Sequence, residues 1–346
     1  MAYQAPIFQD IIASNTYLRH RKPIIERLQQ RLKAKVIIYT ASPYHPVPQI
    51  MIQDVPSFED LLRSVAGAEE GYLMINSPGG DGNAAEKLLT MCRERFTKTF
   101  NVIVPDYAKS AATMVALGSD KILMGYLSEL GPIDPQIRIA PFPGRTIPAR
   151  SFLDGLEMIR KKIREKGDPV QMYFPMLSQI RSETLARCQS AIEGSRGFAE
   201  KWLKKFMLKN NAEQAVKVAR WLSEGKKYKS HGKVIDFEEA KDVLKLNVEK
   251  IDPNSDLWND IWELYCRSIV FLQRRQNQGA AKLFESESVS LIMSLKVIGQ
   301  PRPPPRPQRP PAMPPRRPAP SAPGRPTPSP QQPSQQPPPS KSPTQK

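Results

Sequence analysis

The feature that most constrains the fold is a regular alternation of short apolar runs and helical segments between residues 35 and 125. The runs KVIIYTAS, GYLMINS, FNVIVP and KILMG are rich in branched and aromatic residues and too short for typical helices. Segments with helical spacing and short connections separate them. Buried strands joined by helices are typical of a parallel sheet covered by helices. The sequence therefore predicts an α/β fold with a mostly parallel sheet.

The segments on either side of this region have helical patterns. An amphipathic helix, interrupted near Pro23, is expected over about 7–32, and Ser57 is expected to cap the next helix. After Pro143 the helices are predicted at about 150–166, 173–190, 195–209, 212–223, 236–244 and 256–277, with one short strand, NVEKI, among them.

The segment from Pro301 to Lys346 differs in composition from the rest of the chain. It holds 20 of the 36 prolines, six arginines and two lysines, and it has no acidic or aromatic residue. Such a segment buries too little apolar surface to offset the entropy of ordering, so a disordered tail with polyproline II character is predicted. Its four PxxPxR patterns are typical of SH3 ligands, although a flexible solubilising tail is the simpler interpretation.

Charge and cysteine usage exclude several classes of protein. The tail carries eight of the seventeen net positive charges, and the rest are spread over helices, which does not favour nucleic-acid binding. The residues Cys92, Cys188 and Cys266 are far apart, so neither a disulfide scaffold nor a metal site is predicted. With no signal-peptide pattern and no membrane-length apolar stretch, the sequence predicts a cytoplasmic protein without a cofactor.

Two loops at predicted strand ends carry residues suited to acyl-transfer chemistry. Ligand sites in parallel sheets lie at the carboxyl ends of strands, and SPGGDG and DYAKS both follow strands there. We expect Gly79 and Gly80 to form a turn that a substrate can approach closely, with amides available to an oxyanion. Ser110 would be the nucleophile at a helix start, with the Ala111 amide as second donor. The alternative is that Ser110 only caps this helix.

These motifs carry a family resemblance. INSPGG followed by AKSAATMVALGSDKILM resembles the Clp protease and signal peptide peptidase A superfamily, whose core fold is shared with crotonases. The stretch over 72–137, together with YKSHGKVIDFEEAKDVLKLNVEKID, resembles the serine dehydrogenase proteinase branch. The resemblance implies a serine endopeptidase that forms an acyl-enzyme, acts on a peptide or protein substrate and assembles as a homo-oligomer. By position, its nucleophile falls on Ser110 and its oxyanion donors on Gly79 or Gly80 and Ala111.

The general base is left open by the sequence. Clp proteases place a histidine soon after the nucleophile, but SELGPIDPQ has none, and signal peptide peptidases use a downstream lysine instead. Lys162, which borders an apolar helical stripe, is therefore the first candidate and Lys161 the second, although both could be surface lysines. His231 is a third candidate, or a residue that only fixes its loop. Asp134 is expected to form a turn and Asp81 to cap a helix.

The domain division follows from these expectations. We expect an N-terminal helical segment at 1–34, a Clp/crotonase-like protease domain at 35–255, a helical C-terminal extension at 256–299 and the tail at 300–346. Two other functions remain possible on the sequence alone. One is an inactive Clp-fold scaffold that binds peptides, and the other is a crotonase-like acyl-CoA enzyme, for which no suitable acidic pair is evident.

Overall fold

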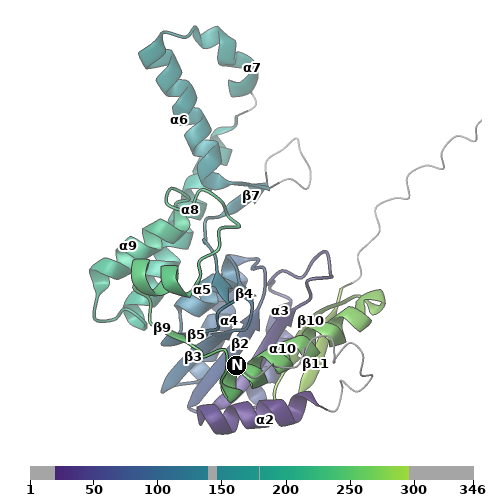
Figure 1. The fold of residues 1–346 in the computed structure, drawn as a ribbon. Coiled ribbons are helices and arrows are strands. Elements are labelled where there is room, and N and C mark those ends of the chain that lie inside the picture. The colour runs from purple at the N-terminus through teal and green to yellow at the C-terminus, as the bar shows by residue number, and fades with distance from the viewer. Residues whose placement is uncertain (1–19, 139–145, 179, 296–346) are drawn as a thin grey trace, which may run out of the picture. The chain divides into compact units, whose positions relative to one another are not determined.

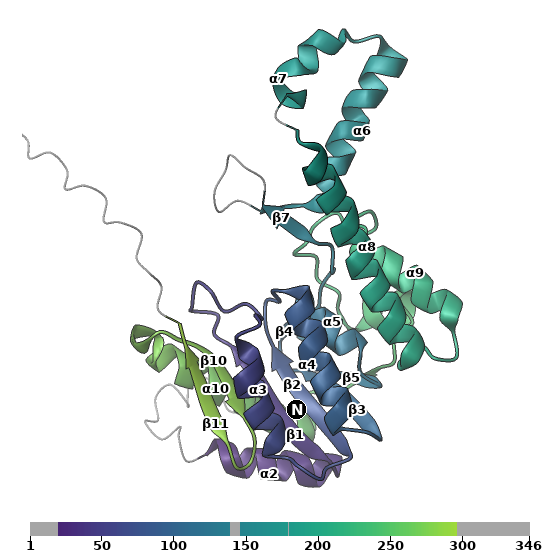
Figure 2. The same cartoon turned by 180° about the vertical axis from the view of Figure 1, so that it is seen from behind.

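A mostly parallel sheet forms the centre of the protein (Figures 1 and 2). The computed structural model describes residues 20–138, 146–178 and 180–295. In this part of the chain the sheet has the order β11-β10-β1-β2-β3-β5-β9. Its strands are β1 (Lys35–Ala41), β2 (Glu70–Asn76), β3 (Thr99–Val104), β5 (Lys121–Met124), β9 (Val248–Lys250), β10 (Ala280–Glu285) and β11 (Ser290–Ser294). The five strands from β1 to β9 pair in parallel, whereas β10 and β11 are antiparallel additions, which confirms the predicted fold class.

Helices cover both faces of this sheet, and others extend away from it (Figures 1 and 2). They are α2 (Arg21–Leu32), α3 (Asp54–Arg63), α4 (Gly82–Arg95), α5 (Ala111–Leu117), α6 (Ala149–Lys166), α7 (Phe174–Leu177), α8 (Ser182–Lys205), α9 (Ala212–Ser223) and α10 (Asp256–Arg274). Short helical turns are η1 (Val170–Tyr173), η2 (Glu239–Val243) and η3 (Gln276–Gln278). Two small sheets pair β4 (Tyr107–Ala108) with β6 (Glu129–Leu130) and β7 (Gln136–Arg138) with β8 (Thr146–Pro148).

The two faces of the sheet bury separate apolar cores, because successive side chains of a strand point to opposite sides. In β1, Val36 and Ile38 pack with α2 and α10, whereas Ile37 and Tyr39 pack with α3 and α4. All four side chains are buried, which explains why β1 is a continuous apolar run rather than an alternating one.

The helices after Pro143 form a less regular layer. The single helix α8 replaces the two predicted at 173–190 and 195–209, and it packs against α9 and α5. The break predicted between 190 and 195 is absent, although Gly194 and Gly197 lie in this part of α8. A glycine within a helix costs only about 1 kcal/mol relative to alanine. Tertiary packing on α9 evidently outweighs that cost.

Two further predictions are corrected by the structure. Helix α3 begins at Asp54 and not at Ser57, because Pro56 is tolerated in a first turn and the Asp54 carboxylate accepts the Met51 amide there. The segment 256–299 is helical only in α10, since β10 and β11 follow it as strands. Neither β10 nor β11 is a continuous apolar run bounded by clear turn residues, so the sequence pattern did not predict these two strands.

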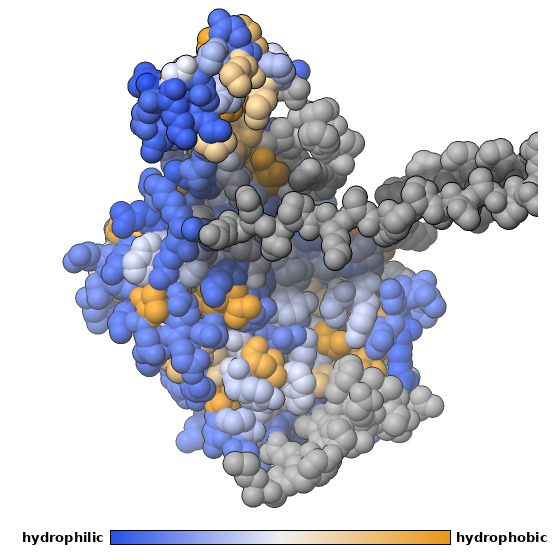
Figure 3. Space-filling view, turned by 45° about the horizontal axis from the view of Figure 1, so that its top comes forward, coloured by the Kyte–Doolittle hydropathy of each residue, from blue (hydrophilic) through white to orange (hydrophobic). Residues whose placement is uncertain are grey.

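The far end of the α6–α7 segment carries exposed apolar side chains. Figure 3 shows apolar and hydrophilic residues side by side at the top of the molecule, over this end. The exposed apolar residues here are Met158, Val170, Met172, Phe174 and Met176. Exposed apolar patches often mark protein contacts, but the homo-oligomer stays a prediction. Among the described residues, no helix is both long and apolar enough to span a membrane.

Several sequence predictions fall outside the described residues. They are the first part of the helix expected at 7–32 and the whole tail with its SH3-type patterns. Of the predicted N-terminal helix, the structure describes α2, which begins two residues before Pro23. The division into four segments also stays a prediction.

We expect Asp81→Ala to lower the free energy of unfolding by about 1 kcal/mol, because Asp81 Oδ1 accepts the Ala84 amide at 2.8 Å and caps α4. Urea denaturation would measure the loss. Asp81→Ser keeps a capping oxygen and serves as the control, so equal stability of the two variants would contradict the capping role.

Candidate active site

Backbone pairing holds the two candidate loops side by side. The Ser77 amide donates to the Tyr107 carbonyl at 3.0 Å, and the Lys109 amide donates to the Ser77 carbonyl at 3.0 Å. The chain just after β2 is thereby joined in parallel to β4, which precedes Ser110. The glycine turn and the serine therefore meet at the carboxyl ends of the strands, where sites in parallel sheets usually form.

Ser110 has a strained backbone conformation. Its φ is 50° and its ψ is −118°, and positive φ is uncommon for residues other than glycine. Such strain costs about 1–3 kcal/mol and clusters at functional sites. Ser110 immediately precedes α5, but its side chain makes no capping hydrogen bond, so a simple capping role does not explain this serine.

Gly79 lies directly against the backbone of the serine. A Cβ placed on Gly79 would be 2.5 Å from the Lys109 carbonyl oxygen, 2.7 Å from Ser110 Cβ and 2.9 Å from the Ala111 nitrogen. Its φ of +96° is also one that residues with a side chain rarely adopt. Only glycine fits here, because both the conformation and the close approach exclude a side chain.

The two glycines differ in what their amides can do. The Gly79 amide already donates to the Ser77 hydroxyl at 3.1 Å. The Gly79 carbonyl accepts the Ile50 amide at 2.7 Å, and because a trans peptide is planar, the Gly80 N–H points the opposite way. Among the described residues neither the Gly80 amide nor the Ala111 amide has a hydrogen-bond partner, so these two are the donors open to an incoming oxyanion.

His231 forms a pair with Asp134. Its Nδ1 lies 2.8 Å from Asp134 Oδ1, with the carboxylate side chain 3% exposed and the imidazole 30% exposed. Asp134 is thus a partner for a histidine, and the turn predicted there is wrong, since residues 131–135 form no turn in the structure. The histidine keeps its other ring nitrogen, which in the described residues makes no hydrogen bond.

Lys109 binds the loop that carries His231. Its ammonium donates to the Leu130 carbonyl at 3.0 Å and to the Lys233 carbonyl at 3.3 Å, and it pairs with Glu129 at 3.0 Å. The loop of His231 is therefore fixed to the residue before Ser110. Neither Lys109 nor the Asp134–His231 pair was predicted. Only its position next to Ser110 could have indicated Lys109, and the two members of the pair are 97 positions apart.

Lys161 and Lys162 lie elsewhere on α6. The helix is anchored near Asp134 at its first residue, where the Ala149 amide donates to the Pro135 carbonyl at 2.9 Å. Lys162 follows Ala149 by about 20 Å along a helix that leads away from the sheet toward α7 (Figures 1 and 2). Lys161 is exposed and pairs with Glu165 at 3.7 Å. No described contact joins either lysine to Ser110, and none joins His231 directly to it.

The cysteines do not supply an alternative nucleophile. All three are buried, and burial raises the pKa of the Cys92 and Cys188 thiols and raises the pKa of Cys266 to about 12. A buried thiol with a raised pKa is rarely the reactive thiolate. Within the described residues, no group of three or more His, Cys, Asp or Glu side chains could hold a metal ion.

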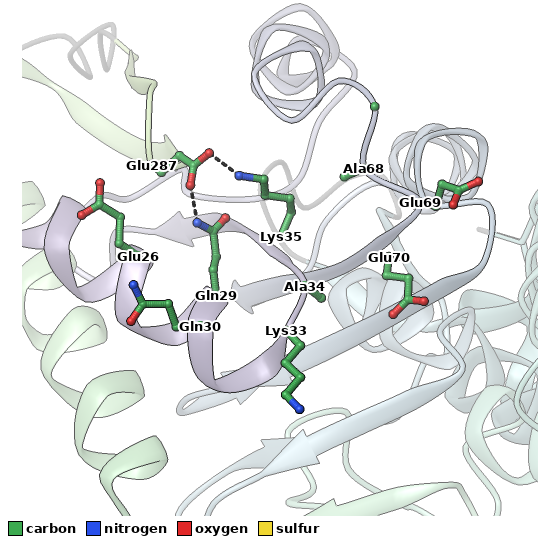
Figure 4. Close-up of a pocket in the computed structure, with 11 residues that line it drawn as sticks. Glu26, Gln29, Gln30, Lys33, Ala34, Lys35, Ala68, Glu69, Glu70 and Glu287 are labelled. Atoms are coloured by element: carbon green, nitrogen blue, oxygen red, sulfur yellow. Dashed lines mark hydrogen bonds and ion pairs between the residues drawn. The ribbon is translucent and has the colours of Figure 1, made fainter.

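A cavity of about 620 Å³ lies at the opposite end of the strands (Figure 4). Lys35 and Glu70, which begin β1 and β2, line it, and Glu287 binds both Lys35 and Gln29. Because Ser110 follows the carboxyl ends of the strands, this open acidic hollow is not part of the same site.

Comparison with known proteins identifies a family for the chain. The model of the family described as ClpP-like SDH-type serine proteinase matches residues 5–274, which is more than half of the chain. The chain belongs to this family. The resemblance seen in the sequence is thereby confirmed, and the match ends before β10 begins at Ala280.

Relatives of the chain include two uncharacterized proteins of Methanocaldococcus jannaschii. One is 29% identical over 57% of this chain and 61% of its own length, and the other is 34% identical over 26% and 32%. The chain thus spans less than two thirds of either relative. A membrane-bound stomatin-specific protease mutant has 16% identity, 66% and 85% coverage and a TM-score of 0.39. A ClpP1 mutant from Listeria monocytogenes has 15% identity, 67% and 99% coverage and a TM-score of 0.30.

We expect Gly79→Ala to destabilise the fold and displace Ser110, because the new methyl group would overlap the Lys109 carbonyl oxygen, Ser110 Cβ and the Ala111 nitrogen. Gly67→Ala is a matched control, since Gly67 also has positive φ (+83°) but nothing within 4 Å of an added Cβ. The control should lose about 1–2 kcal/mol from backbone strain alone. Urea denaturation would compare the two, and an equal loss would contradict the close packing.

Proposed function

We propose that this chain is a serine endopeptidase that hydrolyses peptide bonds through an acyl-enzyme on Ser110. The observation that carries the proposal is the strained Ser110 packed against Gly79, beside the amides of Gly80 and Ala111, which have no hydrogen-bond partner among the described residues. Membership of a serine proteinase family supports the same chemistry. Two backbone amides beside a serine can stabilise the oxyanion that forms when a carbonyl is attacked.

The proposed reaction has two stages. The Ser110 hydroxyl attacks the carbonyl carbon of a peptide bond and gives its proton to a general base, while the amides of Gly80 and Ala111 bind the oxyanion. The base then returns the proton to the leaving amine as the C–N bond breaks. Water hydrolyses the resulting ester by the same steps and frees Ser110.

The contacts favour His231 as the base over the lysines predicted first. A general base needs a partner that orients it, and the buried Asp134 carboxylate binds His231 Nδ1. The Lys109 ammonium also fixes the His231 loop beside the nucleophile. By contrast, Lys162 lies far along α6 from the point where that helix meets Asp134. A lysine from α6 remains the alternative base.

An inactive peptide-binding scaffold is the second candidate function. It is favoured by one observation, namely that no hydrogen bond within the described residues joins the Ser110 hydroxyl to a base. Catalytic hydrogen bonds are often long in the absence of substrate, however, so this observation does not outweigh the arrangement around Ser110. No feature of the site favours an acyl-CoA enzyme.

Ser110→Ala should abolish labelling by a fluorophosphonate probe and hydrolysis of an unfolded protein such as casein, because the nucleophile is lost. Alanine keeps the Cβ of serine, so the backbone strain should not change. Ser151→Ala, at an exposed serine in the first turn of α6, is the control. Equal labelling of the wild type and Ser110→Ala would refute the proposal, whereas no labelling of the wild type would favour the scaffold.

His231→Gln should lower kcat for peptide hydrolysis by about 10²–10⁴-fold, the usual contribution of a general base, and Asp134→Asn should also lower it. Lys162→Met and Lys161→Met, which remove only the ammonium groups, should keep wild-type kcat. Steady-state kinetics on the four variants would decide the base. Loss of activity in a lysine variant, with His231→Gln active, would assign the base to α6.

A further inference from the structure

A buried ion pair lies beside the glycine turn, between helix α3 and strand β10. Lys282 Nζ is 2.5 Å from Asp54 Oδ1, and both side chains are 0% exposed. The second carboxylate oxygen accepts the Tyr39 hydroxyl at 2.8 Å and the Met51 amide at 3.1 Å. A fully buried charge pair is costly to desolvate and adds little stability over an apolar pair, so its presence calls for another explanation.

The pair holds the segment that in turn holds the glycine turn. Asp54 binds the Met51 amide, and the neighbouring residue Ile50 contacts the turn through its backbone. The Ile50 amide donates to the Gly79 carbonyl at 2.7 Å, and the Ile50 carbonyl accepts the Asp81 amide at 2.9 Å. A Cβ on Gly80 would lie 2.3 Å from the Ile50 oxygen, so the two chains are in close contact.

This contact fixes the direction of one amide. The Gly79 carbonyl and the Gly80 N–H belong to one planar peptide group and point in opposite directions. Because Ile50 holds the carbonyl on one side, the Gly80 N–H must face the other side, where it has no partner among the described residues. A shift of Ile50 would therefore rotate the Gly80 N–H away from the direction in which it could donate to an oxyanion.

We propose that Asp54 and Lys282 are positioning residues for the Gly80 amide, acting through Met51 and Ile50. In this proposal neither residue touches substrate. The inference rests on the proposed function, because it takes the Gly80 amide to be a donor to the oxyanion. Lys282 lies in β10, beyond the part of the chain that the family model matches, so the C-terminal strands would contribute to the site. The strand register agrees with this contribution, because Lys282 pairs with Ala41 at the carboxyl end of β1, and the glycine turn also follows the carboxyl end of a strand.

The test compares full-length variants by two measurements. Lys282→Met removes the ammonium and leaves the Asp54 charge buried without its partner, which could prevent folding. The double variant Asp54→Asn/Lys282→Met removes both charges and therefore leaves no lone charge buried. Glu285→Gln is the matched control, because Glu285 lies on the same strand and forms another buried pair, with Arg21 at 2.8 Å, away from the turn.

Hydrogen exchange followed by mass spectrometry is the first measurement. In both Lys282 variants the amides of residues 77–85 and of Ile50 should exchange about tenfold or more faster than in the wild type, whereas the control should not change there. If the Lys282 variants exchange in 77–85 as the control does, the positioning role is wrong, whatever the activity of the protein.

The rate of fluorophosphonate labelling at saturating probe is the second measurement. It should fall by about ten- to a hundredfold in the Lys282 variants with little change in probe affinity, because a misplaced donor affects the transition state rather than binding. An unchanged rate would overturn the inference. If the wild type is not labelled at all, the proposed function fails, and hydrogen exchange alone still decides whether the pair positions the turn.

Discussion

The contact between Gly79 and the backbone of residues 109–111 is the constraint on which the rest of the site depends. Two loops from different strands can approach this closely only where one residue has no side chain. The approach sets the distance between the serine and the glycine turn, and the parallel pairing of Ser77 with Ala108 sets their register.

Much of the sheet could be predicted from the sequence because its signals are local. The strands β1, β2, β3 and β5 are short apolar runs, and each is followed by a turn or helix start that can be recognised within a few residues. The residues Gly79, Gly80 and Ser110 were found in the same way, from glycines and small residues placed after strands. Their choice as site residues needed the rule that parallel strands end at one edge of a sheet, together with the family resemblance of the two motifs.

The rest of the site was harder to predict because it depends on residues distant in sequence. Asp134 and His231 are separated by 97 positions, and no local pattern indicates that they form a hydrogen bond. The same is true of Asp54 and Lys282, which are 228 positions apart. The candidate lysines of α6 were chosen by their position relative to an apolar stripe on that helix, and such a stripe predicts which side of a helix is buried. An apolar stripe does not predict which turn of the helix lies near the nucleophile.

The antiparallel pairing of β10 with β1 has a consequence for solubility. Without β10, one side of β1 would present unpaired N–H and C=O groups along a strand whose side chains are almost all buried. An exposed apolar edge of this kind is a template for pairing with another chain and a common origin of aggregation. A version of the protein trimmed at residue 274, where the family match ends, would expose that edge. The C-terminal strands thus protect the sheet from intermolecular association.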